Sequence, residues 1–172
     1  IYFFRNPERI TPENIDNSLV IAPADGKIIE IEDITPDEEI GLPKNKYTKI
    51  GIFMNVFNVH VNRSPISGEI EKILYKNGKF FNASLDKASK HNERNSIIIN
   101  NNSEKIIVVQ IAGLIARRIL SFISENDTMV KGERIGLIRF GSRVDIYLPL
   151  SYQINVNEND IVVAGQTIIA ER

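Results

Sequence analysis

Short runs rich in β-branched residues recur along most of the chain and are separated by turn-forming residues. Such runs predict β-strands, and many strands at close spacing are typical of an all-β sandwich or barrel. We therefore expect a mainly β fold, a sandwich or barrel-sandwich, with little helix. The predicted strands cover residues 19–21, 27–31, 49–54, 69–75, 96–99, 105–111, 134–138, 144–148 and 161–169.

Helix is expected in one short segment, residues 84–91, where Ser84 is a suitable N-cap and Asp86 lies in the first turn. The pattern of residues 113–123 is compatible with helix or strand, and we favour strand. Residues 100–103, with the sequence NNNS, predict the tip of a hairpin.

Two motifs occur twice in the chain. END-x-x-V-x-G-x-x-I spans residues 125–135 and 158–168, and P-x-x-G-x-I-x-x-I spans residues 23–31 and 65–73. In each, a glycine allows a tight turn and the following isoleucines are suited to the core. The repeats predict pseudo-symmetric hairpins, similar to those of the barrel-sandwich folds of lipoyl and biotinyl domains.

The composition indicates one globular domain, residues 1–172, with 42% hydrophobic and 25% charged residues. A net charge of -1 gives no electrostatic basis for binding nucleic acid. The chain has no cysteine and two histidines, which excludes thiolate and polyhistidine metal centres, and we expect no metal site. No apolar run is long enough to span a membrane.

The first residues, IYFFRNPER, begin with Ile1 rather than Met. Aromatic residues followed by Arg5 and Arg9 fit an interfacial anchor beside a preceding membrane segment. The alternative, which general burial preferences favour, is an aromatic edge strand packed on the core.

Gly141 and Ser142 interrupt a segment in which Val144, Ile146 and Leu148 alternate as in a strand. Without a Cβ, Gly141 leaves its carbonyl open to attack by the Ser142 hydroxyl, which is an N-to-O acyl shift. β-Elimination of the ester would split the chain and leave a dehydroalanine, which hydrolyses to a pyruvoyl group. His60 can take the hydroxyl proton and Asp25 can orient the imidazole.

Several blocks of the sequence resemble, in order, the phosphatidylserine decarboxylase family in its short proenzyme form. They are YFFRNPER, APADGKI, FMNVFNVHVNRSPISGEI, KHNERN, QIAGLIARRI and GERIGLIRFGSRVDIYLP. Many separate blocks at compatible spacing are far more specific than one short motif. The resemblance covers nearly the entire chain.

The resemblance implies self-cleavage between Gly141 and Ser142 into a large chain, residues 1–141, and a small chain, residues 142–172. Ser142 would become the pyruvoyl cofactor, with Asp25 and His60 assisting cleavage. The mature enzyme would decarboxylate phosphatidylserine to phosphatidylethanolamine and CO2 through a Schiff base. His60 would also handle protons during turnover.

Longer family members have a second histidine three residues after the first, where this chain has Arg63. It is therefore open whether His60 serves both cleavage and turnover, or whether His91, otherwise a surface residue at a helix end, takes part. Asn58, Asn62 and Arg63 are candidate substrate-binding residues, with turn and strand-end hydrogen bonding as the alternative. The charge for an anionic headgroup is expected from Arg63, Arg117 or Arg143.

The expected partners are phosphatidylserine, a membrane surface and the two chains of one proenzyme, with a homo-oligomer left open. We expect the protein at the cytoplasmic side of the cell membrane, peripheral or anchored through a segment preceding Ile1. Two alternatives remain: a non-catalytic barrel-sandwich binding or carrier module, and the same chemistry on another lipid with a serine headgroup.

Overall fold

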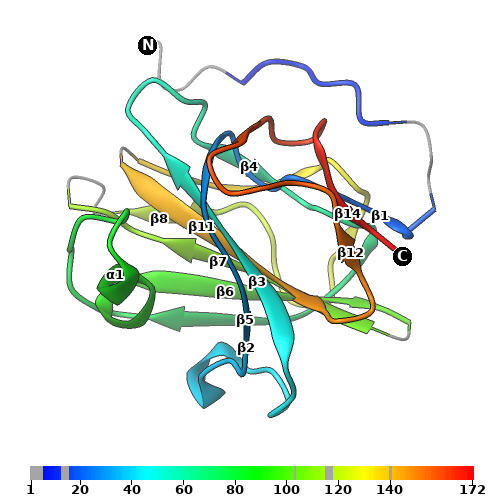
Figure 1. The fold of residues 1–172 in the computed structure, drawn as a ribbon, viewed down its shortest axis with the longest axis horizontal. Helices are drawn as coiled ribbons and strands as arrows, with labels where there is room; N and C mark the ends of the chain where they lie inside the picture. The colour runs from blue at the N-terminus through cyan, green and yellow to red at the C-terminus, as the bar shows by residue number, and fades with distance from the viewer. Residues whose placement is uncertain (1–5, 13–15, 103, 115–117, 140) are drawn as a thin grey trace.

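The computed structural model describes residues 6–12, 16–102, 104–114, 118–139 and 141–172, and these form three antiparallel sheets (Figure 1). The large sheet has the strand order β13-β2-β3-β11-β7-β6-β5-β9. Its strands are β2 (Gly26–Ile34), β3 (Tyr47–Met54), β5 (Gly68–Lys76), β6 (Arg94–Asn101), β7 (Glu104–Ile111), β9 (Thr128–Met129), β11 (Ser142–Pro149) and β13 (Ile161–Val162). The expectation of a mainly β fold is confirmed.

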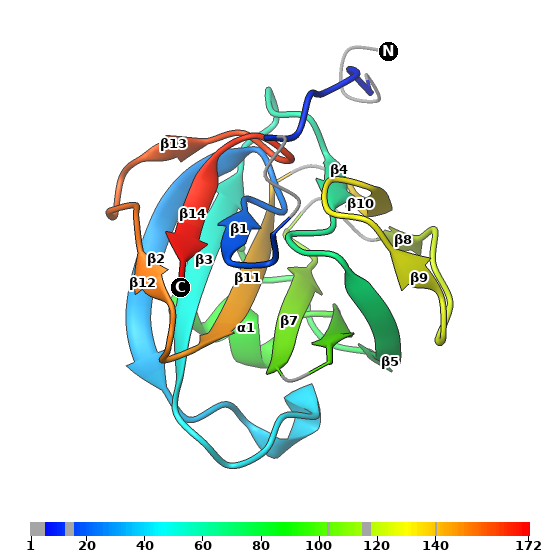
Figure 2. The ribbon, with the colours of Figure 1, turned by 90° about the vertical axis from the view of Figure 1, so that its right-hand side faces the viewer.

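Two three-stranded sheets complete the architecture. One has the order β1-β14-β12 and the other β4-β10-β8. Their strands are β1 (Leu19–Ile21), β14 (Ile168–Glu171), β12 (Gln153–Ile154), β4 (Val61–Arg63), β10 (Arg134–Ile138) and β8 (Ile119–Ser121). The described helices are the α-helix α1 (Asp86–His91) and the 3-10 helix η2 (Glu38–Ile40). Figure 2 shows the large sheet curling, with the smaller sheets beside its concave side.

The main hydrophobic core lies on the concave face of the large sheet. On β11, Val144, Ile146 and Leu148 are fully buried in it, as the alternation of the sequence predicts. Arg143, Asp145 and Tyr147 are on the opposite face of the same strand. There a second, smaller core forms under η2 and the loop that follows it.

The repeated motifs form equivalent units, but these are not the predicted hairpins, because each unit pairs two strands that lie far apart in the sequence: β2 with β13, and β5 with β9. The N–H of Asn126 donates to the carbonyl of Ile70 at 2.7 Å, and the N–H of Asn159 donates to that of Ile28 at 2.8 Å. Both asparagines adopt the left-handed conformation, with φ of 71° and 75°. The glycines of the two END-x-x-V-x-G-x-x-I copies, Gly132 and Gly165, also match, with φ of 88° and 78°. The pseudo-symmetry predicted from the repeats is therefore present in the backbone.

Two local predictions are wrong. Residues 161–169 are not one strand, because a turn closed by hydrogen bonds from residues 166 and 167 to the carbonyl of Val163 divides them into β13 and β14, which join different sheets. The helix begins at Asp86 after Leu85, and Ser84 does not cap it. The Ser84 hydroxyl instead donates to Asn82, which organises the preceding turn.

The expected hairpin tip is present, and among the described residues the preference for strand in the segment 113–123 holds only at residues 119–121. The hairpin tip at residues 100–103 joins β6 to β7, with Ser103 outside the described residues. The segment 113–123 contains strand β8, while its residues 115–117 lie outside the description.

Among the described residues, no helix is long and apolar enough to cross a membrane.

Candidate active site

The passage from β10 to β11 carries the chain from a small sheet into the centre of the large sheet. Gly141 lies at this passage with a φ of +61°, a conformation that L side chains rarely adopt. A Cβ at Gly141 would meet no atom within 4 Å, so the backbone angle rather than space favours glycine here. The interruption of the strand pattern thus marks the point at which the chain passes from one sheet to another.

Ser142 is the first residue of β11 and is paired with Met54 of β3. Its side chain is fully buried on the same face as Val144, toward the main core. The Ser142 Oγ has no hydrogen-bond partner among the described residues. A buried hydroxyl beside a left-handed glycine therefore marks the Gly141–Ser142 peptide.

The carbonyl of Gly141 lies directly against Gly113, in the loop after β7. A Cβ built on Gly113 would lie 1.7 Å from the Gly141 oxygen and 2.8 Å from its carbonyl carbon. Any side chain at position 113 would displace this peptide. Sequence reasoning did not single out Gly113, although the block QIAGLIARRI contains it.

His60 immediately precedes β4 and is only 4% exposed. The N–H of Ile138, at the end of β10, donates to the His60 carbonyl at 3.2 Å, which ties His60 to the strand leading to Gly141. Burial lowers the pKa of His60 below its ordinary value, while a hydrogen bond with the backbone of Asn58 and the charge of Asp25 act in the opposite direction. The imidazole is therefore neutral near neutral pH.

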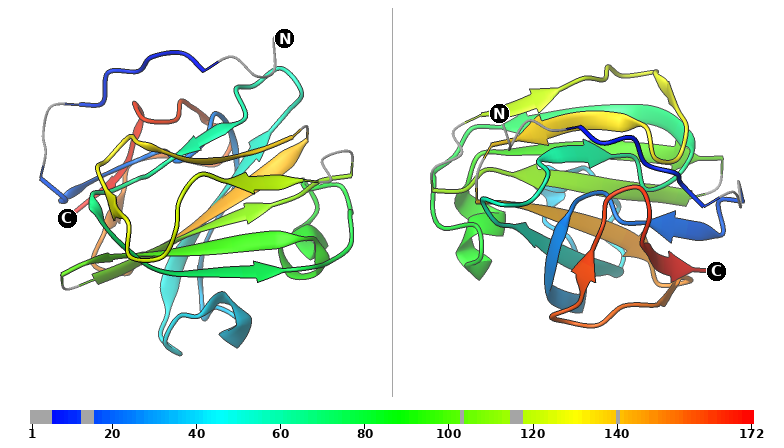
Figure 3. Two further views of the ribbon diagram at one scale, coloured as in Figure 1. Left: turned by 180° about the vertical axis from the view of Figure 1, so that it is seen from behind. Right: turned by 90° about the horizontal axis from the view of Figure 1, so that it is seen from above.

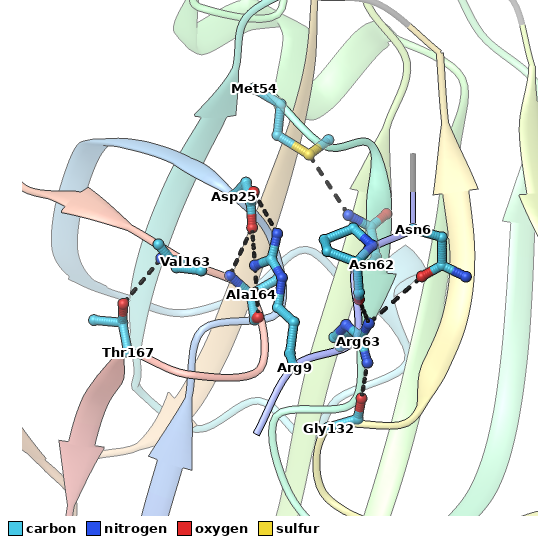
Figure 4. A network of polar contacts seen from close by, with 11 residues as sticks. Asn6, Arg9, Asp25, Met54, Asn62, Arg63, Gly132, Val163, Ala164 and Thr167 are labelled. Carbon is cyan, nitrogen blue, oxygen red and sulfur yellow. Dashed lines mark hydrogen bonds and ion pairs between the residues drawn. The ribbon is translucent and has the colours of Figure 1, made fainter. Parts of the chain in front are cut away.

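Asp25, in the turn before β2, is held by two groups (Figure 4). Its carboxylate accepts two hydrogen bonds from the Arg9 guanidinium, at 2.5 and 2.8 Å, and one from the Ala164 N–H at 2.8 Å. Its charge still acts on His60. Sequence reasoning placed Arg9 in an N-terminal anchor, whereas in the structure Arg9 is the ion-pair partner of Asp25.

A chain of buried amides begins on β4, two residues after His60. The Nδ2 of Asn62 approaches the sulfur of Met54 at 3.5 Å. Its Oδ1 accepts a hydrogen bond from Gln110 at 2.9 Å, and Gln110 accepts one from Asn95 at 3.1 Å. Asn62 is thus fixed in the core next to the strand partner of Ser142.

The other sequence candidates differ in position. Asn58 closes the turn before His60, where its Oδ1 accepts from the Asn55 N–H at 2.9 Å. Arg63 is buried at the end of β4. His91 is exposed at the end of α1, and its ring lies edge-on to Phe81.

Arg143 is not available to a ligand beside Ser142, because it points to the opposite face of β11. It is fully buried and ion-paired with Asp145 at 2.5 Å and with Glu30. These two carboxylates raise its pKa against the effect of burial. Arg117 and the aromatic residues 2–4 lie outside the described residues.

The arrangement has the groups that intramolecular acyl transfer requires: a buried hydroxyl, a neutral imidazole and a carboxylate that acts on that imidazole. Among the described residues, no cluster of His, Asp and Glu is suited to hold a metal ion.

Comparison with known proteins bears directly on this site. Residues 1–170 match the family model described as phosphatidylserine decarboxylase. The chain is also 57% identical over 169 residues to a phosphatidylserine decarboxylase proenzyme of Azorhizobium caulinodans, a match that covers 98% of this chain and 72% of the relative.

Proposed function

This chain belongs to the phosphatidylserine decarboxylase family, and we propose that it converts phosphatidylserine to phosphatidylethanolamine and CO2 with a pyruvoyl group made from Ser142. Membership confirms the resemblance read from the sequence and the expectation of an enzyme, a decarboxylase. It also decides against the non-catalytic carrier alternative. The observation that carries the proposal is the buried Ser142 hydroxyl beside the left-handed Gly141.

We propose that the chain first cleaves itself. The Ser142 Oγ attacks the Gly141 carbonyl carbon, the amide nitrogen of Ser142 leaves as an amine, and an ester replaces the peptide bond. Loss of the Ser142 α-proton and departure of the Gly141 carboxylate then give a dehydroalanine. Addition of water and release of ammonia leave the pyruvoyl group at the start of residues 142–172.

Three features of the site support this sequence of steps. Gly113 leaves room for the Gly141 carbonyl, whose carbon must change geometry when it is attacked. His60 is neutral, so it can accept the Ser142 proton. After cleavage, the small chain would keep its place because β11 pairs with both β3 and β7.

The pyruvoyl group would accept the electron pair left on the substrate α-carbon when CO2 departs. The protein has to orient the headgroup and deliver a proton to that carbon. We propose that His60 first takes up the proton that the substrate ammonium group loses when it forms the Schiff base, and then donates it to that carbon, with Asn62 and the backbone of Asn58 fixing the geometry around it. His91, the other histidine of the chain, is exposed at the end of α1.

A lipid substrate requires the site to meet a bilayer, and we propose peripheral membrane association. Two large apolar side chains next to the site are exposed: Phe57, 72% exposed in the loop before His60, and Leu114, 61% exposed next to Gly113. Exposed aromatic and aliphatic residues near a site are suited to the membrane interface.

Intact-mass measurement of the purified protein tests the proposal. We expect two chains that separate between residues 141 and 142, with the small chain beginning in a group that hydroxylamine modifies. Ser142→Ala should give one uncut chain and no phosphatidylethanolamine. Full activity from an uncut chain, or cleavage in Ser142→Ala, would refute the assignment.

Gly113 provides a second test of the same site. We expect Gly113→Ala to reduce self-cleavage at least about tenfold, because the new methyl group displaces the Gly141 carbonyl. Gly141→Ala is the contrast: its Cβ has space and only the left-handed angle is strained, at a cost of about 1 kcal/mol. Rates of fragment formation, compared with thermal unfolding of each variant, separate a displaced peptide from a destabilised fold. Equal cleavage in Gly113→Ala and wild type would contradict the prediction.

A further inference from the structure

A cationic pocket adjoins the candidate active site. It has a volume of about 490 Å³, within the usual range of small-molecule sites. Its lining residues are Arg9, Thr11, Arg63, Lys131, Gly132, Glu133 and Arg134. Four of these carry a positive charge and one a negative charge.

Among these charged residues, Arg63 is the most unusual, because it is buried without a carboxylate partner among the described residues. It is 8% exposed, and within the described part of the chain its guanidinium donates only to neutral acceptors: the carbonyls of Gly132 and Pro7, at 2.8 and 2.9 Å, and more distantly the amide of Asn6 (Figure 4). Burial and the charges of neighbouring Arg134 and Arg9 lower its pKa, while Asp25 acts in the opposite direction. Buried charges are normally paired, so the position favours an anion.

Lys131 and Arg134 extend the same imbalance. Lys131 is 8% exposed, and its ammonium donates to the backbone carbonyl of Asp16 at 2.8 Å. Arg134 is exposed on β10, where it pairs with Arg63 across the strands. Neither of them, nor Arg63, has an ion-pair partner among the described carboxylates, whereas Arg9 is paired with Asp25.

The pocket is joined to the site by two of its own residues. Arg9 lines the pocket and holds the Asp25 carboxylate. Arg63 follows His60 by three residues in the same stretch of chain. The segment 6–12, which contributes Arg9 and Thr11, runs along the outside of the molecule (Figure 3, dark blue). A group bound here would therefore be close to the groups that act on Ser142.

We propose that this pocket binds the phosphodiester of the serine phospholipid, with Arg63, Lys131 and Arg134 supplying the charge. The inference rests on the proposed function for the identity of the lipid. Guanidinium groups match phosphate oxygens in geometry and charge, and two of them beside an ammonium compensate a phosphodiester more than fully. Glu133, an exposed residue of the same pocket, carries a negative charge that weakens the binding of an anion.

Affinity for glycerophosphoserine tests the proposal, because this compound has the headgroup and phosphodiester but no acyl chains. Titration calorimetry on the uncut Ser142→Ala chain keeps binding separate from cleavage and turnover. We expect Arg134→Gln to raise the Kd about tenfold, the loss typical of one charge-assisted hydrogen bond. Glu133→Gln should lower the Kd a few-fold. Lys44→Gln, which removes an exposed charge near η2, is the matched control and should leave the Kd unchanged.

The proposal is overturned if glycerophosphoserine does not bind the Ser142→Ala chain, or if its Kd is unchanged when Arg134→Gln or Glu133→Gln is added to that chain. Inorganic phosphate is the second ligand. If it binds as tightly as glycerophosphoserine, the pocket is a site for free phosphate and the headgroup assignment is wrong. Cleavage and phosphatidylethanolamine formation, measured on the chain with Ser142, report the proposed function independently. Failure there would leave the measured affinity of the pocket standing.

Discussion

Two pseudo-symmetric units of this protein have matching backbone hydrogen bonds and hold different side chains at one equivalent position. The first unit comprises residues 23–31 with 158–168, and the second comprises residues 65–73 with 125–135. In the first, Asp25 accepts the N–H of Ala164 at 2.8 Å. In the second, Ser67 accepts the N–H of Lys131 at 2.9 Å. One structural hydrogen bond is thus made by a carboxylate in one unit and by a hydroxyl in the other.

The difference shows how a structural position acquires a chemical role. Among the described residues, Ser67 bonds only to uncharged groups, the N–H of Lys131 and the side-chain amide of Asn17. Asp25 makes the equivalent bond with one oxygen and also holds Arg9, and its charge reaches His60. A carboxylate has enough acceptor sites to serve a turn and a charged network together. The repeat supplies the scaffold, and one substitution within it supplies the charge.

The largest expected effect separates the two units by function. Asp25→Asn should slow self-cleavage at least about a hundredfold, because the imidazole loses the charge that stabilises its protonated form. Ser67→Ala removes the equivalent hydrogen bond and should change the rate by less than about threefold. Fragment formation followed by mass measures both. Similar rates in the two variants would show that the units do not differ in function.

Asp25→Asn leaves Arg9 without its partner, which can destabilise the fold. The double variant Asp25→Asn with Arg9→Gln removes both charges and serves as its control. We expect the double variant to recover thermal stability and to remain slow in cleavage. If the double variant instead recovers cleavage, the role of Asp25 is to neutralise Arg9 and not to act on His60.

A pH titration sharpens the comparison. Because burial lowers the pKa of His60, its contribution to stability is present above its ordinary value of 6.5 and is lost as pH falls through the lowered pKa. Self-cleavage, which needs the neutral imidazole, should fall over the same range. Asp25→Asn should move the midpoint to lower pH, whereas Ser67→Ala should not. Proton NMR of the two histidines in the Ser142→Ala chain measures this directly.

The smallest expected effect tests whether the two units are structurally equivalent. Asn126 and Asn159 have nearly the same positive φ, so Asn126→Ala and Asn159→Ala should each cost about 1 kcal/mol of unfolding free energy. Replacement of either asparagine by Gly should cost less. Denaturant unfolding of the Ser142→Ala chain gives these values. A difference of more than about 1 kcal/mol between the alanine variants would break the structural equivalence.

The sequence by itself determined the mainly β fold, most strands and the residues singled out as chemical candidates, Asp25, His60 and the Gly141–Ser142 pair. These follow from alternation, turn residues and repeated motifs, which are local in the chain. The alternation also places Arg143 on the opposite face from Val144, which argues against its role at a headgroup.

Only the tertiary structure decided which groups meet. Three contacts depend on segments far apart in the sequence: Arg9 pairs with Asp25, Gly113 makes room for the Gly141 carbonyl, and Arg63 donates to the carbonyl of Gly132. The division of residues 161–169 between two sheets has the same origin. A local pattern fixes which face of a strand a side chain occupies, but packing of distant elements determines what lies across from that face.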